Sequence, residues 1–343
     1  MILSVTYLLS VLIAQVAAGE RIFIIINIQS SQRNLLAISQ NDTIKIFIVH
    51  GYQNEMGGGT LFQVDSQGTS KTCIIPAKIP QKGGTTRVVG TLYDGRPTIC
   101  GGDSGSECFY YSTLFERWQT YGRIDTQRVE AASVDLGGNR WLIAGGIDVG
   151  KTSPNRLEEL SSSVIFRGGV TRPGPELPAA LSRHCLLRMN SSHLFLAGGY
   201  NRKTKSAREA YLFNHDEEKW TRLPDMKMRR EDHGCAMLDG DKVIVFGGYG
   251  GSEFRETAVM EHSEILSLST LTWSEGPTDP LMEGVAKWTA FPYMGSFLAV
   301  EVNKDSEWIW YLDREASEFR QFFKIGVITG YPILLPNSHA LSC

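Results

Sequence analysis

The sequence predicts an all-β protein built from a repeated sheet module, and three observations indicate it. Short apolar runs bounded by turn residues recur, as at Val243 to Phe246, and Val, Ile and Phe favour strands. A Gly-Gly pair ends most of these runs, and glycine allows positive φ and close backbone approach at a strand end. The pairs recur at a period of about 50 residues, which is typical of repeat architectures.

The spacing of the glycine pairs supports this interpretation. The second glycine of each pair lies at position 102, 146, 199 or 248, so the steps are 44, 53 and 49 residues. Weaker copies extend the series, with His50-Gly51 before the first pair and Val300-Glu301 after the last. A β-sandwich with glycine-rich turns is the alternative fold, but a sandwich has no reason to repeat at this period.

The residues after each pair also repeat. A second apolar strand follows a polar loop, then an isolated large residue, and a further strand comes before the next pair. The second strands are expected at Phe109 to Ser112, Ala210 to Asn214, Glu264 to Leu268 and Trp308 to Asp313, and the large residues are Trp118, Trp220, Trp273 and Phe319. Each module therefore holds about four short strands.

This pattern resembles the kelch repeat, which combines an apolar run, Gly-Gly, a later strand and a Trp at a roughly fixed distance. The resemblance covers nearly the whole chain after residue 19 and is best in the units Gly199 to Trp220 and Gly248 to Trp273. The unit around Gly146 lacks its Trp. The resemblance implies a kelch-type β-propeller, with six four-stranded blades expected and five or seven as alternatives.

A propeller needs a closing strand, because closure removes the exposed sheet edges that invite aggregation. Two apolar segments compete for this place, Arg21 to Ile28 and Lys324 to Leu335, and the sequence does not choose between them. The first blade is expected to use Leu35 to Ile38, Ile44 to Val49, Leu61 to Val64 and Thr72 to Ile75.

Residues 1–19 are expected to be a secretory signal peptide, followed by the propeller domain over residues 20–343. The apolar centre runs from about Tyr7 to Ile13, and small residues offer a cleavage site near residue 18 or 19. An uncleaved anchor or a buried first strand are the alternatives. No other segment reaches the length of a membrane span. A secreted, extracellular chain could carry glycans at the sequons of Asn41 and Asn190.

The even cysteine count agrees with export, and no cysteines show the CxxC spacing of a zinc site. Six cysteines allow 15 pairings, and the repeat favours three of them. Cys185 and Cys235 hold near-equivalent places in successive units, Cys100 and Cys108 flank one Gly-Gly turn, and Cys73 and Cys343 remain near the two ends of the ring. Buried, reduced cysteines are the alternative.

Candidate partner contacts come from the loops after the glycine pairs, which converge on one face of a propeller. Arginine and aromatic residues are enriched in binding hot spots. The candidates are Arg128, Asp148, Tyr200, Arg202, Arg229, Arg230, His233 and Tyr249. For Arg230, His233 and His184 two interpretations stay open: hydrogen bonds between neighbouring blades, or a ligand site at the mouth of the central channel.

Together these features predict an extracellular, non-enzymatic module that binds an unidentified protein or glycan through its loops. The net charge of −3 gives no support to a nucleic-acid partner, and no metal or other cofactor is expected. A self-associating matrix component is one alternative. An enzyme is the other, but the copper site of galactose-oxidase-like propellers and the Asp boxes of sialidases are both missing from the sequence.

Overall fold

The computed structural model describes residues 44–50, 59–64, 70–75, 79–80, 87–103, 105–150, 157–250, 258–279, 287–293, 295–302, 308–315, 317–324, 330–335 and 339–341. All of them lie in the compact unit Leu35–Cys343, and the second unit, Met1–Asn34, falls outside these ranges. The predicted signal peptide, the segment Arg21 to Ile28, the strand Leu35 to Ile38 and the sequon at Asn41 therefore lie outside the described residues.

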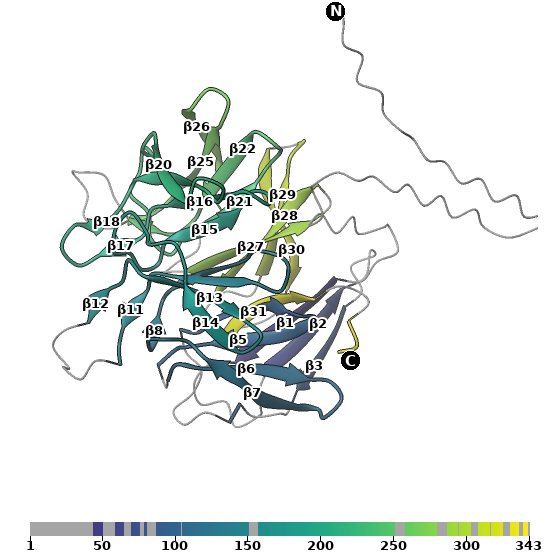
Figure 1. The fold of residues 1–343 in the computed structure, drawn as a ribbon. Coiled ribbons are helices and arrows are strands. Elements are labelled where there is room, and N and C mark those ends of the chain that lie inside the picture. Colours follow the sequence, from purple (N-terminus) through teal and green to yellow (C-terminus); the bar gives the residue numbers. More distant parts are fainter. Residues whose placement is uncertain are drawn as a thin grey trace, which may run out of the picture. The chain divides into compact units, whose positions relative to one another are not determined.

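Six four-stranded antiparallel sheets make up most of the described chain (Figure 1). The first contains β31 (Gly330–Leu335), β1 (Ile44–His50), β2 (Gly59–Val64) and β3 (Ser70–Ile75); the second contains β4 (Val89–Tyr93), β5 (Arg96–Cys100), β6 (Glu107–Ser112) and β7 (Arg117–Arg123). The third contains β9 (Ala132–Asp135), β10 (Trp141–Ala144), β13 (Ser163–Arg167) and β14 (Val170–Pro173); the fourth contains β15 (Cys185–Arg188), β16 (His193–Ala197), β19 (Ala210–Asn214) and β20 (Lys219–Leu223). The fifth contains β21 (Gly234–Met237), β22 (Lys242–Phe246), β25 (His262–Ser267) and β26 (Thr272–Thr278); the sixth contains β27 (Lys287–Tyr293), β28 (Ser296–Val302), β29 (Trp308–Asp313) and β30 (Glu318–Lys324).

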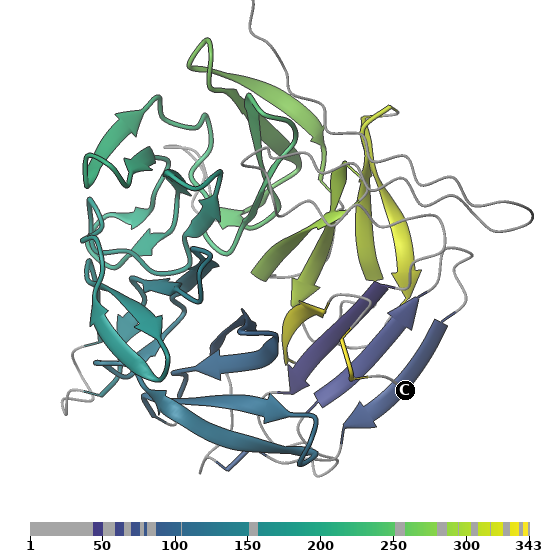
Figure 2. The same ribbon diagram turned by 45° about the vertical axis from the view of Figure 1, so that its right-hand side comes forward.

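The sheets radiate from a common centre, as Figure 2 shows. The innermost strands neighbour one another in the order β31, β4, β9, β15, β21 and β27. The predicted all-β propeller is therefore confirmed, and a β-sandwich does not fit, because the six described sheets surround one centre with separate apolar clusters between neighbours instead of forming two layers over one core.

The core consists of apolar clusters between neighbouring sheets. Strand β22 shows the principle, because Val243 and Val245 pack toward the fourth sheet, whereas Ile244 and Phe246 pack toward the sixth. Successive side chains of a strand point to opposite faces, so a strand between two neighbours must be apolar at every position. This explains the continuous apolar runs in the sequence.

The glycine pairs join each sheet to the next. The amide of Gly146 donates to the Leu181 carbonyl at 2.8 Å, and the amide of Gly199 donates to the Arg230 carbonyl at 2.8 Å. Both glycines of the Gly198-Gly199 pair have positive φ, 57° at Gly198 and 103° at Gly199. A Cβ at Gly198 would lie 2.6 Å from the ring of His233, so the next sheet can approach only a glycine.

The first sheet is completed by β31, which pairs antiparallel with β1 from Lys45↔Leu335 to His50↔Gly330. Of the two candidate closing segments, the structure therefore uses the one near the C-terminus. The innermost place of this sheet is held by β31, and the strand predicted at Leu35 to Ile38 lies outside the described residues. Ile333 and Leu335 explain the choice, since both are buried in the cluster between the first and second sheets.

Candidate functional site

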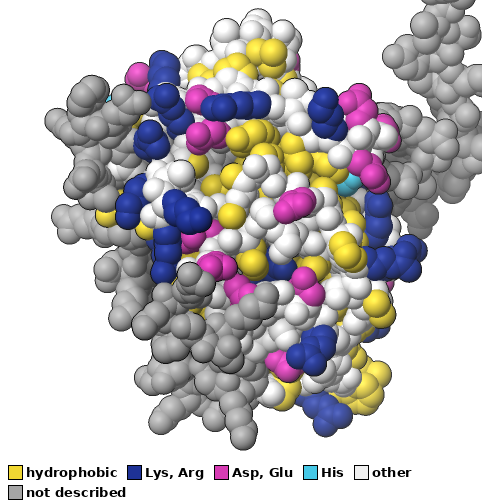
Figure 3. All heavy atoms as spheres, turned by 60° about the vertical axis from the view of Figure 1, so that its left-hand side comes forward, with side chains coloured by type: hydrophobic (Ala, Val, Ile, Leu, Met, Phe, Trp, Pro, Cys, Tyr) yellow, Lys and Arg dark blue, Asp and Glu magenta, His cyan; other side chains and the backbone are white. Residues whose placement is uncertain are grey.

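Short extra strands lie beside the glycine pairs of the third, fourth and fifth sheets, and all but β8 follow the pair in the sequence. They are β8 (Arg128–Val129), β11 (Ile147–Asp148) and β12 (Glu158–Glu159), the hairpin of β17 (Tyr200–Asn201) and β18 (Lys205–Ser206), and the hairpin of β23 (Tyr249–Gly250) and β24 (Ala258–Val259). Isolated bridges tie Tyr200 to Ser182 and Tyr249 to Glu231. Figure 3 brings the side of β11, β12, β17 and β18 forward and shows basic and acidic side chains interspersed around an apolar stretch.

A ring of charged residues lies beside these hairpins. Arg87, Glu130, Arg183 and Asp232 each stand two residues before the inner strand of successive sheets, so the sign of the charge alternates from sheet to sheet. Their φ values are 58°, 55°, 54° and 56°. A left-handed conformation is uncommon for residues other than glycine, so its recurrence at four equivalent positions marks a feature of the repeat. We call these four residues the charged ring.

Ion pairs and backbone hydrogen bonds hold the charged ring together. Arg183 Nε lies 2.6 Å from Glu130 and 3.8 Å from Asp232, and Arg87 lies 3.4 Å from Glu130. The Arg183 amide donates to the Glu130 carbonyl, and the Asp232 amide donates to the Arg183 carbonyl, both at 2.9 Å. The amide of Trp288, in the inner strand of the sixth sheet, donates in turn to the Asp232 carbonyl, also at 2.9 Å. Neighbouring sheets are therefore linked around the centre by main chain and by charge.

The ionisation of the ring follows from burial and these contacts. Burial alone would raise the pKa of Glu130, but hydrogen bonds and charge from Arg183 and Arg87 lower it below its usual range. Burial alone would lower the pKa of Arg183, but the hydrogen bond to Glu130 and the charges of the nearby carboxylates raise it above its usual value. Burial raises the pKa of Asp232 to about 6, although Lys287 and Arg183 act in the opposite direction. All four ring residues are thus charged at neutral pH, and Asp232 is the first of them to become protonated as the pH falls below about 6.

The cations of the ring are its accessible part. The side chain of Arg87 is 43% exposed and that of Arg183 is 32% exposed, whereas Glu130 and Asp232 are each 12% exposed. The Arg183 guanidinium also lies 5.6 Å from the ring centre of Tyr200, within the range of a cation–π contact. A partner that approaches this face therefore meets two guanidinium groups and one aromatic ring.

Tyr200 is the predicted contact residue that the structure brings to the charged ring. Its hairpin is tied there a second time, because the Ser206 hydroxyl donates to the Glu231 carboxylate at 2.9 Å. Tyr249 is half-buried, and its main chain exchanges two hydrogen bonds with Glu231. Arg202 is exposed at the hairpin tip, 3.7 Å from Glu159.

Arg128 and Arg230 have a different role from the predicted one. Arg128 donates to the carbonyls of Gly145 and Ser162 at 3.1 and 3.0 Å, and Arg230 donates to the Gly247 carbonyl at 3.0 Å. Both are buried, so neither can touch a partner in this structure. Each arginine side chain thus ties together loops of its own sheet, and for Arg230 these contacts are not the bonds to neighbouring blades that were one of its two interpretations.

Two further candidates are buried as well. Asp148 accepts the amide of Gly150 at 2.9 Å and is 6% exposed. His233 is 3% exposed, and its ring packs against Gly198 of the preceding sheet. Arg229 is half-buried and donates to the Ser206 carbonyl at 3.1 Å, which places it beneath the β17–β18 hairpin.

Two of the three favoured cysteine pairs are disulfides in the structure. Cys100 and Cys108 join β5 to β6 with a Cα–Cα distance of 4.1 Å, and Cys185 and Cys235 join the inner strands of the fourth and fifth sheets at 6.1 Å. Cys73 in β3 is also disulfide-bonded. Cys343 lies outside the described residues, so its pairing with Cys73 stays a prediction.

The sequon residue Asn190 is exposed in the turn before β16. Its side-chain oxygen accepts the amides of Ser192 and His193, both at 2.8 Å. The turn is therefore ordered and open to solvent. Glycosylation at Asn190, like that at Asn41, stays a prediction.

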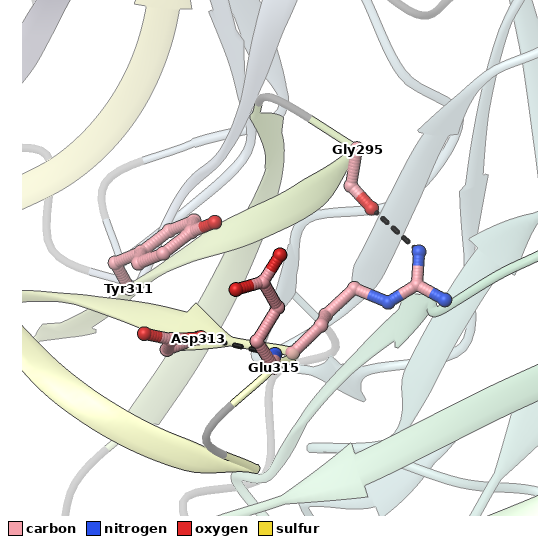
Figure 4. A pocket seen from close by; sticks show the side chains of 5 residues that line it. Gly295, Tyr311, Asp313 and Glu315 are labelled. Atoms are coloured by element: carbon pink, nitrogen blue, oxygen red, sulfur yellow. Dashed lines mark hydrogen bonds between the residues drawn. The ribbon is translucent and has the colours of Figure 1, made fainter.

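A shallow polar pocket lies at the opposite ends of the strands, on the turns of the sixth sheet (Figure 4). It is lined by Gly295, Tyr311, Asp313, Arg314 and Glu315. Its residues bond to one another, with Arg314 donating to the Gly295 carbonyl at 2.9 Å and Glu315 donating its amide to Asp313 at 3.0 Å. None of the predicted contact residues lines it, so the charged ring is the stronger candidate site.

Within the described ranges, no three His, Cys, Asp or Glu side chains are grouped so as to hold a metal ion. In the same ranges, no helix has the length and apolar character needed to cross a membrane.

Known proteins resemble this chain over part of its length. An F-box/kelch-repeat protein of Arabidopsis thaliana is 32% identical over 118 residues, which cover 32% of this chain and 30% of that protein. A second one from Arabidopsis thaliana is 30% identical over 122 residues, or 35% of this chain and 29% of the other. The tRNA wybutosine-synthesizing protein 4 of Candida albicans is 29% identical over 110 residues, which cover 32% of this chain and 15% of that protein. The chain thus spans a third or less of the length of these relatives.

The fold also has a solved counterpart. The structure of YjhT matches with a TM-score of 0.61 and 10% identity over 80% of this chain and 97% of that chain. Identity this low speaks for the fold alone. No family model matches the sequence. Together with the kelch-repeat relatives, this likeness shows that the fold is a kelch-type β-propeller.

Proposed function

We propose that this chain is a secreted, non-enzymatic binding module whose partner, an extracellular protein or glycan, contacts the charged ring and the hairpins beside it. The relatives with kelch repeats support a protein-interaction module. The single observation that carries the proposal is the arrangement around Arg183. Two partly exposed guanidinium groups and Tyr200 share one face and are fixed by ion pairs and main-chain bonds from several sheets.

This arrangement suits binding better than catalysis. Arginine and tyrosine are enriched in the hot spots of protein interfaces, where rigid side chains lose little entropy on binding. The carboxylates of the ring are mostly buried, and Glu130 is held ionised by arginine, so it is a poor proton donor near neutral pH. The enzyme named among the relatives matches over only 15% of its own length.

The binding face is tested by comparing surface variants with a matched control. Arg87→Ala and Tyr200→Ala each remove one accessible group of the face, and Arg222→Ala removes an exposed arginine from the outer strand β20. The immobilised chain captures partners from extracellular fluid and from an array of glycans, and the retained partner is titrated against each variant. We expect affinity to fall about tenfold or more for the two face variants and to be unchanged for the control. Equal affinity for all three would overturn the proposal.

The extracellular setting has its own test. The full chain is expressed in cells with a secretory pathway, and the medium is analysed for the protein and its mass. We expect secreted chain without residues 1–19 and a glycan that is lost in Asn190→Gln. A chain that stays inside the cell would contradict secretion. The binding face is tested by the capture experiment alone.

A further inference from the structure

The β17–β18 hairpin, residues Tyr200 to Ser206, concentrates positive charge. Its tip carries Arg202, Lys203 and Lys205, all exposed, and the hairpin contains no acidic residue. The chain as a whole has a net charge of −3, so this +3 hairpin is a local feature and does not follow from the overall composition. The hairpin lies toward the left of Figure 1, and the ring of its Tyr200 is 5.6 Å from the Arg183 guanidinium of the charged ring.

The hairpin is ordered by contacts at its base. The Asn201 side chain donates to the Ala180 carbonyl at 2.7 Å and accepts the amide of Lys203 at 2.9 Å. Arg229 donates to the Ser206 carbonyl at 3.1 Å, and so adds a fourth cation beneath the tip. A partner therefore has little conformational entropy to remove from the backbone before it contacts the cations.

The tip cations are largely unneutralised. Arg202 is the exception, at 3.7 Å from Glu159, but 46% of its side chain is exposed. Among the described residues, neither Lys203 nor Lys205 has an acidic side chain within ion-pair distance. Positive charges within about 10 Å of one another add their potentials at physiological salt, so the tip attracts polyanions.

We propose that this hairpin binds a sulfated polysaccharide. Lysine is depleted from protein–protein interfaces, and the tip cations Arg202, Lys203 and Lys205 have no apolar or aromatic residue between them, since Tyr200 lies at the base of the hairpin against Arg183. An acidic protein segment therefore fits the tip less well. Short segments rich in lysine and arginine are typical of heparin-binding or nucleic-acid-binding patches. The choice of a glycan rests on the proposed extracellular function, and it names the ligand class for this part of the face.

The experiment uses the full secreted chain and a size-defined heparin oligosaccharide. Binding is measured by calorimetry over salt from about 50 to about 300 mM, where screening weakens exposed charge contacts. The triple variant Arg202→Ala, Lys203→Ala, Lys205→Ala is compared with Arg117→Ala, Lys219→Ala, Arg320→Ala, which removes three exposed cations from the outer strands β7, β20 and β30. Unfolding midpoints of both variants show whether each one is folded.

We expect heparin affinity to fall about tenfold or more in the hairpin variant and less than about twofold in the control. Affinity should also fall as salt rises, and desulfated heparin should not bind. Equal loss in both variants would show attraction to charge in general and overturn the proposal. Tighter binding of polyglutamate or of an oligonucleotide than of heparin would overturn it too.

This result is separable from the function proposed above. If heparin fails to bind while Arg87→Ala and Tyr200→Ala still weaken the captured partner, the hairpin inference is wrong and the binding face stands. If heparin binds through the hairpin but the chain never reaches the medium, the extracellular setting is wrong and the charge chemistry stands.

Discussion

At the scale of single residues, His184 and His233 show how a place in the repeat fixes chemistry. Each lies just before the inner strand of its sheet, and each ring packs against the first glycine of the preceding pair, Gly145 or Gly198. Burial disfavours the charged imidazolium and lowers the pKa of each histidine to about 3, with smaller contributions from Lys287 near His184 and Arg230 near His233. Both side chains are therefore neutral parts of the core.

These pKa values predict a pH dependence of stability. An unfolded histidine has a pKa of about 6.5, so below that pH the unfolded chain binds a proton that the folded chain rejects. The contribution of each buried histidine to the free energy of unfolding is therefore fully present above pH 6.5 and is lost as the pH falls below that value. Replacing His184 by Leu removes this loss, so the stability of His184→Leu relative to the native protein should improve by about 1.4 kcal/mol per pH unit below about pH 6. Urea unfolding between pH 7.5 and about 4.5 measures it.

The comparison must be made between variants, because Asp232 acts in the opposite direction. Its pKa of about 6 in the folded state means that the folded chain gains stability as the pH falls toward 4. His262→Leu is the matched control, since the side chain of His262 is 49% exposed. Parallel pH profiles for His184→Leu and the native protein would contradict the burial argument.

The sequence revealed the site only partly at this scale. It drew attention to Arg128 and Arg230 because of their charge, but charge does not report burial. A better signal was available, since each lies 17 residues before the first glycine of its pair, at 145 or 247. A recurrent spacing to a structural glycine indicates a structural role. The charged ring had no such signal, because its position recurs while its residue type changes sign from sheet to sheet.

At the scale of elements, the long strands were predictable and the short ones were not. Runs such as Val243 to Phe246 are apolar at every position because two neighbours bury them, and this pattern is visible without a structure. The two-residue strands β17 and β18 are polar and gain their order from Asn201 and from contacts to other loops. The strand propensities of these residues do not reveal such contacts.

The two disulfides should differ in their contribution to stability. Cys185–Cys235 closes a separation of 50 residues and Cys100–Cys108 closes one of 8. By loop-closure entropy, the longer loop stabilises the fold by about 4 kcal/mol and the shorter by about 2.5 kcal/mol. Cys185→Ala with Cys235→Ala should therefore lower the free energy of unfolding more than Cys100→Ala with Cys108→Ala.

Urea unfolding of the two double variants measures this difference, and each serves as the control for the other. All four cysteines are buried, so the loss of packing is similar in the two pairs. A larger loss from the hairpin pair would show that native-state packing, and not the constraint on the unfolded chain, dominates.

At the scale of the whole molecule, closure of the ring could not be derived from the sequence. Two apolar segments near opposite ends were equally suitable, and the choice depends on which one pairs with β1, a contact between residues about 290 positions apart. Periodicity describes what a module contains, but it does not say how the first and last modules meet.

Closure predicts that β31 is essential to the entire fold. Ile333 is 2% exposed in the cluster between the first and second sheets, so Ile333→Asp buries a carboxylate without a partner and exposes the edge of β1. We expect a loss of about 3 kcal/mol or more, together with aggregation. The control is Ile74→Asp on the outer strand β3, where Ile74 is 46% exposed and the expected change is within about 0.5 kcal/mol.

Urea unfolding and light scattering of the two variants check this prediction. Similar stability for both would mean that the first sheet folds without its fourth strand. A monomeric Ile333→Asp protein with native stability would contradict the importance of closure.

The pairing of β1 with β31 has a consequence for biosynthesis. Ribosomes add about 5–20 residues per second, so β1 emerges roughly 15–60 s before the strand that completes its sheet. During translation the first sheet therefore has only β1, β2 and β3 while the residues of the other five sheets are being added. A chain that ended before Gly330 would lack β31, so β1 would keep an unpaired edge and the ring could not close.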